Sequence, residues 1–248
     1  MPRVLAETDD VLVVNKPAGL IVHNDGRTHE PSLADWIFER YPALADVGGS
    51  WVSPQSEHVP LRGIVHRLDR TTSGILVVAK TPEAYEYLKH EFKERRVEKV
   101  YRAFVYGRME SDDGKIVAEV MRSNTLPKRW YARLCDEGEK RAAITEWRLL
   151  KNVTDTGESA AYIEVSPKTG RTHQIRVHFA SIGHPLVADH LYAEGRPALF
   201  GFKRPALHAH SISFMRGGKR EKFVAPLPDD FKIAENLVGS FTFGESML

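Results

Sequence analysis

The most informative stretch of this chain is His66-Arg67-Leu68-Asp69-Arg70-Thr71-Thr72-Ser73-Gly74, which runs directly into the apolar segment Ile75-Leu76-Val77-Val78-Ala79. A turn rich in hydroxyl groups and glycine therefore leads into a buried strand, and one carboxylate, Asp69, lies in that turn between two arginines. Flanking guanidinium groups favour the ionised form of a carboxylate. An aspartate kept charged beside an apolar strand is either a paired structural ion or a nucleophile.

The segments on either side alternate between strand and helix patterns. Ser32 can cap a helix that runs to about Tyr41, and Thr81-Pro82-Glu83 has the cap and proline typical of a helix start. Strand patterns are the more numerous, at Val11–Val14, Ile75–Ala79, Lys99–Gly107, Lys115–Val120, Ala142–Leu150, Ala160–Val165, Leu207–Phe214 and Lys222–Val224. We therefore predict an α+β fold built on a largely antiparallel mixed sheet. Neither a GxGxxG nor a GxxxxGK[ST] motif is present, which disfavours a nucleotide-binding fold.

The composition is that of a globular protein with one large domain or two fused halves. The 248 residues are 42% hydrophobic and 27% charged. A single cysteine, Cys135, excludes internal disulfides and multi-cysteine zinc sites, and indicates a reducing cytoplasm. The first residues lack the apolar core of a signal peptide, and no run reaches membrane-spanning length.

The charge is nearly balanced, with 35 basic and 33 acidic residues, but the basic residues are clustered. Lys89 to Arg102 and Arg122 to Arg141 each carry six basic residues against three acids, and Lys203 to Lys222 carries six against one. Lys128 and Arg129 precede Trp130 and Tyr131 directly. Basic residues beside stacking rings suit single-stranded or looped nucleic acid, so we predict a polyanion partner, although each cluster alone could be a solvated surface.

A second informative stretch is Gly170-Arg171-Thr172-His173-Gln174-Ile175-Arg176-Val177-His178. The spacing predicts a helix over Thr172–Ile182 that ends at Gly183, with Arg176 on a face of small residues from which it can reach inward. An inward arginine needs an anion, and Asp69 is the obvious candidate; the alternative is an ordinary solvated arginine. His173 and His178 lie about 140° apart on such a helix, which is a poor arrangement for a metal ion.

Other chemistries fit less well. No GxSxG motif supports a serine hydrolase, and no second acidic motif supports a two-carboxylate glycosidase. Tyr101 lies on a predicted strand, where it could be a core residue, stack on a flat ring or transfer a proton. Its spacing in the sequence does not choose between these roles.

Together these segments resemble one family, the RluA-type pseudouridine synthases, which isomerise uridine in structured RNA. The stretch from His66 to Gly74 is similar to the family's catalytic motif, Lys99-Val100-Tyr101-Arg102-Ala103 to its tyrosine motif, and Gly170 to His178 to its third motif. Further similarity is carried by Asn15–Gly19, by Gly183-His184-Pro185 with Asp189, and by Leu207-His208-Ala209. The likeness spans roughly Val11 to Pro228 in the family's order.

The resemblance implies a role for each matching residue. Asp69 would act on the ribose as nucleophile or base, Tyr101 would pack against the uracil and can help remove the C5 proton, and Arg176 would orient Asp69. Ile175 would line the uracil pocket and Arg67 would fill the space left in the RNA stack. The other expected substrate-binding residues are His66, Thr72, Arg171 and His173, and the RNA-backbone candidates are Lys128, Arg129 and Lys99.

The resemblance also implies a pseudouridine synthase fold of two fused halves with the active-site cleft between them. We expect a single catalytic domain over residues 1–248 without a separate N-terminal RNA-binding domain, and a cytoplasmic monomer that acts on rRNA or tRNA with no metal, nucleotide cofactor or membrane. The alternative is a non-catalytic RNA-binding or ribosome-assembly factor on the same fold. Ala188 stands where the family usually has glycine, so its turn is expected to differ. The segment from Val47 to Pro60 is predicted to be a mobile surface loop, with contact to RNA through Trp51 and His58 as the alternative.

Overall fold

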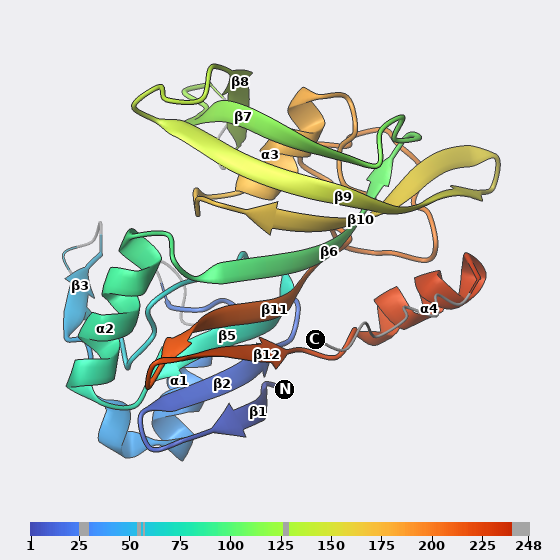
Figure 1. Cartoon of the computed structure of the whole chain (residues 1–248). Coiled ribbons are helices and arrows are strands. Elements are labelled where there is room, and N and C mark those ends of the chain that lie inside the picture. The colour runs from blue at the N-terminus through green and yellow to red at the C-terminus, as the bar shows by residue number, and fades with distance from the viewer. Residues whose placement is uncertain (25–29, 54–55, 57, 126–128, 240–248) are drawn as a thin grey trace.

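The main feature of the computed structural model, which describes residues 1–24, 30–53, 56, 58–125 and 129–239, is a ten-stranded mixed sheet (Figure 1). Its order is β1-β2-β5-β11-β6-β10-β9-β7-β8, with β12 paired to β11. The strands are β1 (Arg3–Glu7), β2 (Val11–Lys16), β5 (Ser73–Ala79), β6 (Glu98–Tyr106), β7 (Asp113–Arg122), β8 (Trp130–Leu134), β9 (Ala142–Asp155), β10 (Glu158–Pro167), β11 (Leu207–Arg216) and β12 (Lys219–Val224). Only β5 and β11 pair in parallel among these described strands, so the predicted antiparallel mixed sheet is confirmed.

The sheet is shared by two halves that meet at β6 (Figure 1). One half contains β1, β2, β5, β11 and β12 with α1 (Leu33–Arg40) and α2 (Pro82–Lys93). The other contains β7 to β10 with α3 (Gln174–Ser181), and α4 (Asp229–Leu237) follows β12. The apolar core of the described residues is divided into three clusters, so the cleft between the halves can hold polar groups without breaking a single continuous core.

Local sequence signals explain where the elements begin. Ser32 caps α1 by accepting a hydrogen bond from the backbone N–H of Asp35, whose carboxylate accepts one in return. The hydroxyl of Thr81 accepts from the backbone N–H of Ala84 at the start of α2. All seven residues of β5 are buried, as its apolar run predicts, although the strand begins at Ser73 rather than Ile75.

Three expectations differ from the structure. The helix predicted over Thr172–Ile182 is shorter, because His173 adopts a left-handed φ of 55° and α3 begins only after it. The segment from Val47 to Pro60, predicted to be a loop, contains a hairpin of β3 (Ser50–Val52) and β4 (His58–Pro60), which the sequence did not predict. Ala188 has a φ of 56°, so its turn keeps a left-handed conformation that glycine would adopt without strain.

The helices of the described residues are short, and none of them combines the length and the hydropathy that a bilayer span requires.

Candidate active site

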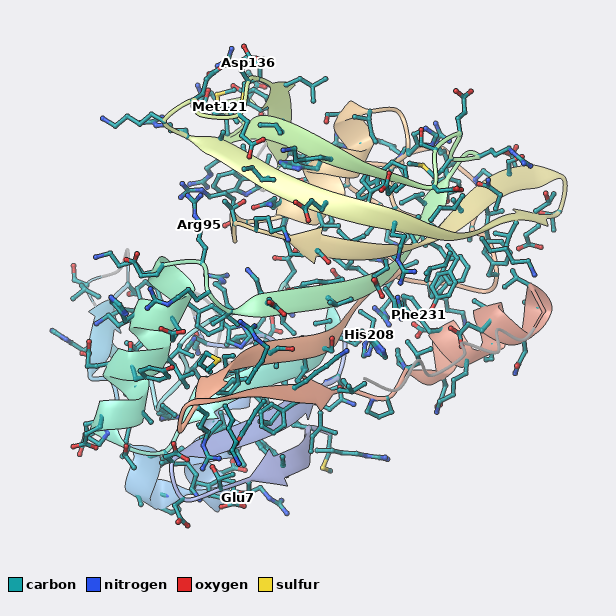
Figure 2. The ribbon with its side chains drawn as sticks, viewed as in Figure 1. Glu7, Arg95, Met121, Asp136, His208 and Phe231 are labelled. Carbon is teal, nitrogen blue, oxygen red and sulfur yellow. The ribbon has the colours of Figure 1, made fainter. Side chains whose placement is uncertain are left out.

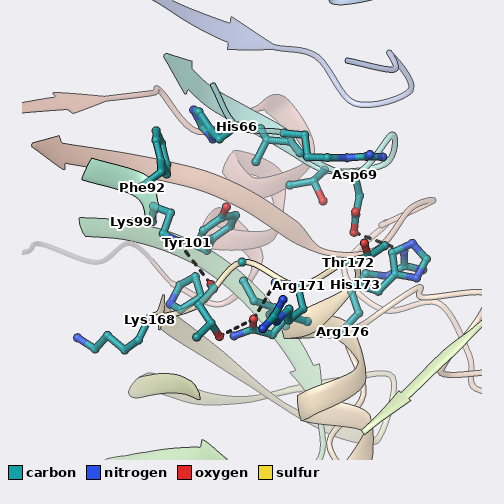
Figure 3. A pocket seen from close by; sticks show the side chains of 18 of the residues that line it. His66, Asp69, Phe92, Lys99, Tyr101, Lys168, Arg171, Thr172, His173 and Arg176 are labelled. Atoms are coloured by element: carbon teal, nitrogen blue, oxygen red, sulfur yellow. Dashed lines mark hydrogen bonds and ion pairs between the residues drawn. The ribbon is translucent and has the colours of Figure 1, made fainter. Parts of the chain in front are cut away.

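A cleft of about 450 Å³ opens between the two halves and brings the three sequence motifs together (Figure 3). One half contributes the turn before β5, β6 contributes its first residues, and the other half contributes the segment leading into α3. Nearly all predicted site residues line this cleft: His66, Arg67, Asp69, Thr72, Lys99, Tyr101, Arg171, His173, Ile175 and Arg176. Arg129 is not among the lining residues, and Lys128 lies outside the described residues.

Asp69 is presented to the cleft by a tight turn, closed by a hydrogen bond from the backbone N–H of Thr72 to the carbonyl of Asp69 at 3.1 Å. Its side chain keeps 22% of its surface exposed. The turn is followed by Gly74, whose φ is +119° and at which a Cβ atom would lie 2.1 Å from the carbonyl oxygen of Ala209. Glycine is therefore required for β5 to approach β11 at the base of the turn that carries Asp69.

Two cations hold the backbone just after Asp69. The fully buried Lys16 directs its Nζ to the carbonyl oxygens of Pro17, Leu20 and Arg70, and burial lowers its pKa to about 7. Arg204 donates to the carbonyl of Thr71 at 3.1 Å and pairs with Asp230. Sequence reasoning gave neither residue a role, although Lys16 belongs to a segment that resembles the family.

The ion pair of Asp69 comes from Arg176 rather than from its neighbours in the sequence. Arg70, which precedes the catalytic-motif threonines, pairs with Glu30 at 2.5 Å, so its guanidinium is engaged by another carboxylate. The Nη1 atom of Arg176 lies 3.7 Å from Oδ2 of Asp69, which confirms the predicted pair, and Arg176 is buried as predicted. This distance leaves an ion pair without a direct hydrogen bond.

The stronger partner of Arg176 is Asp189, which sequence reasoning did not assign. Its carboxylate accepts bonds of 2.7 and 2.8 Å from Nε and Nη2 of Arg176, and its side chain is completely buried. Such a two-point contact fixes the plane of the guanidinium. The sequence signal that could have predicted this pair was the inward arginine together with an aspartate in the segment that follows its helix.

A tyrosine packs beneath this arginine. The Tyr192 ring centre lies 5.0 Å from the guanidinium carbon of Arg176. Its hydroxyl accepts a hydrogen bond from the backbone N–H of Trp130 and lies 2.8 Å from Nδ1 of His173. His173 therefore belongs to the wall of the cleft and is connected to α3 and β8 through Tyr192. The sequence reasoning gave Tyr192 no role.

Tyr101 and Ile175 supply apolar surface to the cleft that Asp69 faces. Figure 3 shows the Tyr101 ring in this cleft. Tyr101 pairs with Val165 of β10 and Ala209 of β11, so it lies where the two halves join. Burial, and then the nearby charge of Asp69, raise the pKa of Tyr101 well above its usual value. Its hydroxyl therefore stays protonated at neutral pH.

The histidines near the cleft are uncharged supports. Nε2 of His66 accepts a hydrogen bond from the backbone N–H of Val77, and its ring stacks on Phe92 with 4.6 Å between centres. Burial lowers the pKa of His66 to about 3. Within the described part of the chain, no three His, Cys, Asp or Glu side chains are grouped as metal ligands would be.

Comparisons with known proteins point to one family. A sequence model of the RNA pseudouridylate synthase family matches residues 10–181. A protein of Zymomonas mobilis named ribosomal large subunit pseudouridine synthase D is 34% identical over 93% of this chain and 71% of its own length. An uncharacterized RNA pseudouridine synthase of Chloroflexus aurantiacus is 39% identical, over 88% of this chain and 64% of its own. The solved structure of human RNA pseudouridylate synthase domain containing 1 aligns with a TM-score of 0.68 and 27% identity, over 92% of this chain and 84% of that one.

The fold and the family match together define an RNA pseudouridylate synthase domain. The chain belongs to the RNA pseudouridylate synthase family, and the resemblance predicted from its motifs is confirmed. It spans 58% to 71% of the length of curated relatives such as those of Neisseria meningitidis and Zymomonas mobilis.

Proposed function

We propose that this protein isomerises specific uridines in structured RNA, rRNA or tRNA, to pseudouridine. The observation that carries the proposal is the partly exposed carboxylate of Asp69, paired with a buried arginine and facing the same cleft as Tyr101 and Ile175. The names of relatives that refer to the large ribosomal subunit make rRNA the first substrate to test.

The reaction is balanced without an external oxidant or reductant. The C1′–N1 bond of uridine breaks, the uracil turns, and C5 bonds to C1′; the C5 proton leaves and N1 gains one. Asp69 can attack C1′ directly or remove a proton from the ribose to give a glycal, and both routes need one anion at the sugar. The target nucleotide must leave its stack, which costs a few kcal/mol.

The surrounding residues suit supporting roles. We assign Tyr101 to pack against the uracil, Ile175 to line its pocket and Arg67 to occupy the space left in the RNA. Because Tyr101 is a phenol at neutral pH, it can accept the C5 proton only after losing its own. The single-domain organisation, monomeric state, cytoplasmic location and freedom from cofactors stay predictions.

The test is release of tritium from ribosomal RNA and tRNA transcripts labelled at uridine C5. We expect the wild-type protein to release tritium to water and Asp69→Asn to release none while it still binds RNA. Asp136→Asn, which changes an exposed aspartate away from the cleft, is the matched control.

Release by Asp69→Asn at the wild-type rate would refute the role of Asp69. Tight binding by the wild-type protein without any tritium release from either RNA would favour the non-catalytic alternative.

A further inference from the structure

The basic residues of the segment Lys89–Arg102 divide into two groups. Three are neutralised by carboxylates: Lys89 by Glu86, Arg96 by Glu91 and Arg102 by Glu164. The other three, Lys93, Arg95 and Lys99, form no ion pair with any described residue, and all three line the same cleft as Asp69. The positive charge left uncompensated by the fold is thus concentrated at the end of the cleft beside α2.

Arg95 keeps an unfavourable backbone conformation at this position. It follows the C-cap of α2 with a φ of 59°, a place that usually belongs to glycine. A side chain in this left-handed region costs stability, and such strain at an exposed residue points to a use for the side chain. The guanidinium extends from the end of α2 toward the half of the molecule that carries β9 and β10 (Figure 2).

Lys99 lies deeper in the same part of the cleft. Its Nζ has one polar contact among the described residues, the carbonyl oxygen of Thr169 on the opposite wall at 3.4 Å, and burial lowers its pKa to about 8. A neighbouring anion would reverse that effect, because it stabilises the ammonium. The stacked rings of Phe92 and His66 form the apolar side of this space (Figure 3).

We propose that Lys93, Arg95 and Lys99, with Phe92, form a phosphodiester subsite that binds the RNA backbone beside the everted nucleotide. The subsite is continuous with the space in front of Asp69, and a nucleotide that enters this space brings its own phosphodiester links to the mouth of the cleft. This proposal rests on the proposed function for its position next to a target uridine. Binding of a phosphodiester at the subsite can be measured without turnover.

The experiment measures binding of fluorescein-labelled hexauridylate by fluorescence anisotropy at several KCl concentrations, with Asp69→Asn as the parent protein. We expect Arg95→Asn and Lys93→Gln each to weaken binding several-fold at low salt. Each should also reduce the slope of log Kd against log salt by about 0.7, the value for one phosphate contact on a single strand. Lys89→Gln, which alters a lysine paired on the same helix, should change neither quantity.

A thermal melt separates binding from folding. Asn tolerates the left-handed backbone better than Arg, so Arg95→Asn should weaken binding without lowering Tm. Affinity and slope equal to those of the parent in both cleft variants, an equal loss in Lys89→Gln, or no saturable binding by the parent would each overturn the subsite. Loss of binding in the cleft variants while the wild-type protein releases no tritium would refute the proposed function and leave the subsite standing.

Discussion

At the scale of single residues, the notable feature is an arginine shared by two aspartates. Asp189, which is completely buried, takes the Nε and Nη2 side of Arg176 and so leaves Nη1 to face Asp69. A carboxylate deep in the fold therefore sets the position of the charge that faces the cleft. The sequence could predict that an inward arginine needs an anion, but spacing along the chain does not show that Asp189 folds back under the helix.

Removing the buried carboxylate should affect both stability and turnover. Asp189→Asn leaves Arg176 buried without its main partner, which typically costs about 3–5 kcal/mol, so we expect a lower free energy of unfolding in urea titrations. Tritium release should fall at least about tenfold, since a 1.4 kcal/mol change in transition-state stabilisation suffices for that.

A double variant separates the two effects. Arg176→Met with Asp189→Leu removes both buried charges, so stability should recover in part while turnover stays low. Full activity in that double variant would contradict the orienting role given to Arg176.

At the scale of elements, the position of the turn that carries Asp69 depends on how closely β5 approaches β11. The two strands pair in parallel over only two residue pairs, Ser73 with His208 and Gly74 with Ala209. Lys16 and Arg204 hold the preceding turn through the carbonyls of Arg70 and Thr71. The carboxylate is thus placed by backbone contacts between distant segments.

Gly74→Ala should disrupt this arrangement. A Cβ would lie 2.1 Å from a backbone oxygen that cannot move aside cheaply, and the φ of +119° is strained for any other residue. We expect a loss of more than about 3 kcal/mol, or failure to fold, because overpacking and backbone strain add together. Gly183→Ala, with φ of +82° and open space around it, should cost only about 1 kcal/mol. Equal effects of the two variants on the urea midpoint would contradict the importance of close packing.

The sequence predicted most strands of the sheet because their apolar residues alternate or form buried runs, and it predicted the capped starts of α1 and α2. It failed where tertiary contacts override local pattern. His173 looks like a helical residue, but its side chain contacts Tyr192 and its backbone turns left-handed before α3. The segment from Val47 to Pro60 that contains the hairpin of β3 and β4 is rich in Gly, Ser and Pro, so it lacks the alternation by which strands are recognised.

At the scale of the whole molecule, several histidines are buried in an uncharged form. His178 and His208 are completely buried, and burial lowers their pKa to about 4 and about 3. Neither ring nitrogen of His178 has a hydrogen-bond partner among the described residues. In the unfolded chain these rings would bind protons near pH 6.5, so the unfolded state takes up protons first as the pH falls.

Stability should therefore decline as the pH falls from about 6.5 toward 4. Each such histidine contributes about 2 kcal/mol of loss by pH 5, which corresponds to a Tm decrease of roughly 4–8 °C. Calorimetry at pH 7 and pH 5 measures this difference. His178→Leu should reduce it and should not lower Tm at pH 7, because it removes an unpaired polar ring.

The exposed His190 supplies the control, since His190→Leu should leave the difference in Tm between pH 7 and pH 5 unchanged. A melting temperature independent of pH over this range would contradict the buried, neutral state of these rings.

The position of β6 has a mechanical consequence. Its edges are hydrogen-bonded to β11 on one side and β10 on the other, so both walls of the cleft belong to one ladder. Opening the cleft by separating its walls would break the hydrogen bonds of β6, so the cleft is expected to be rigid. The distortion needed for docking must then be supplied by the incoming polynucleotide, and flexible loops should be preferred over stiff duplexes.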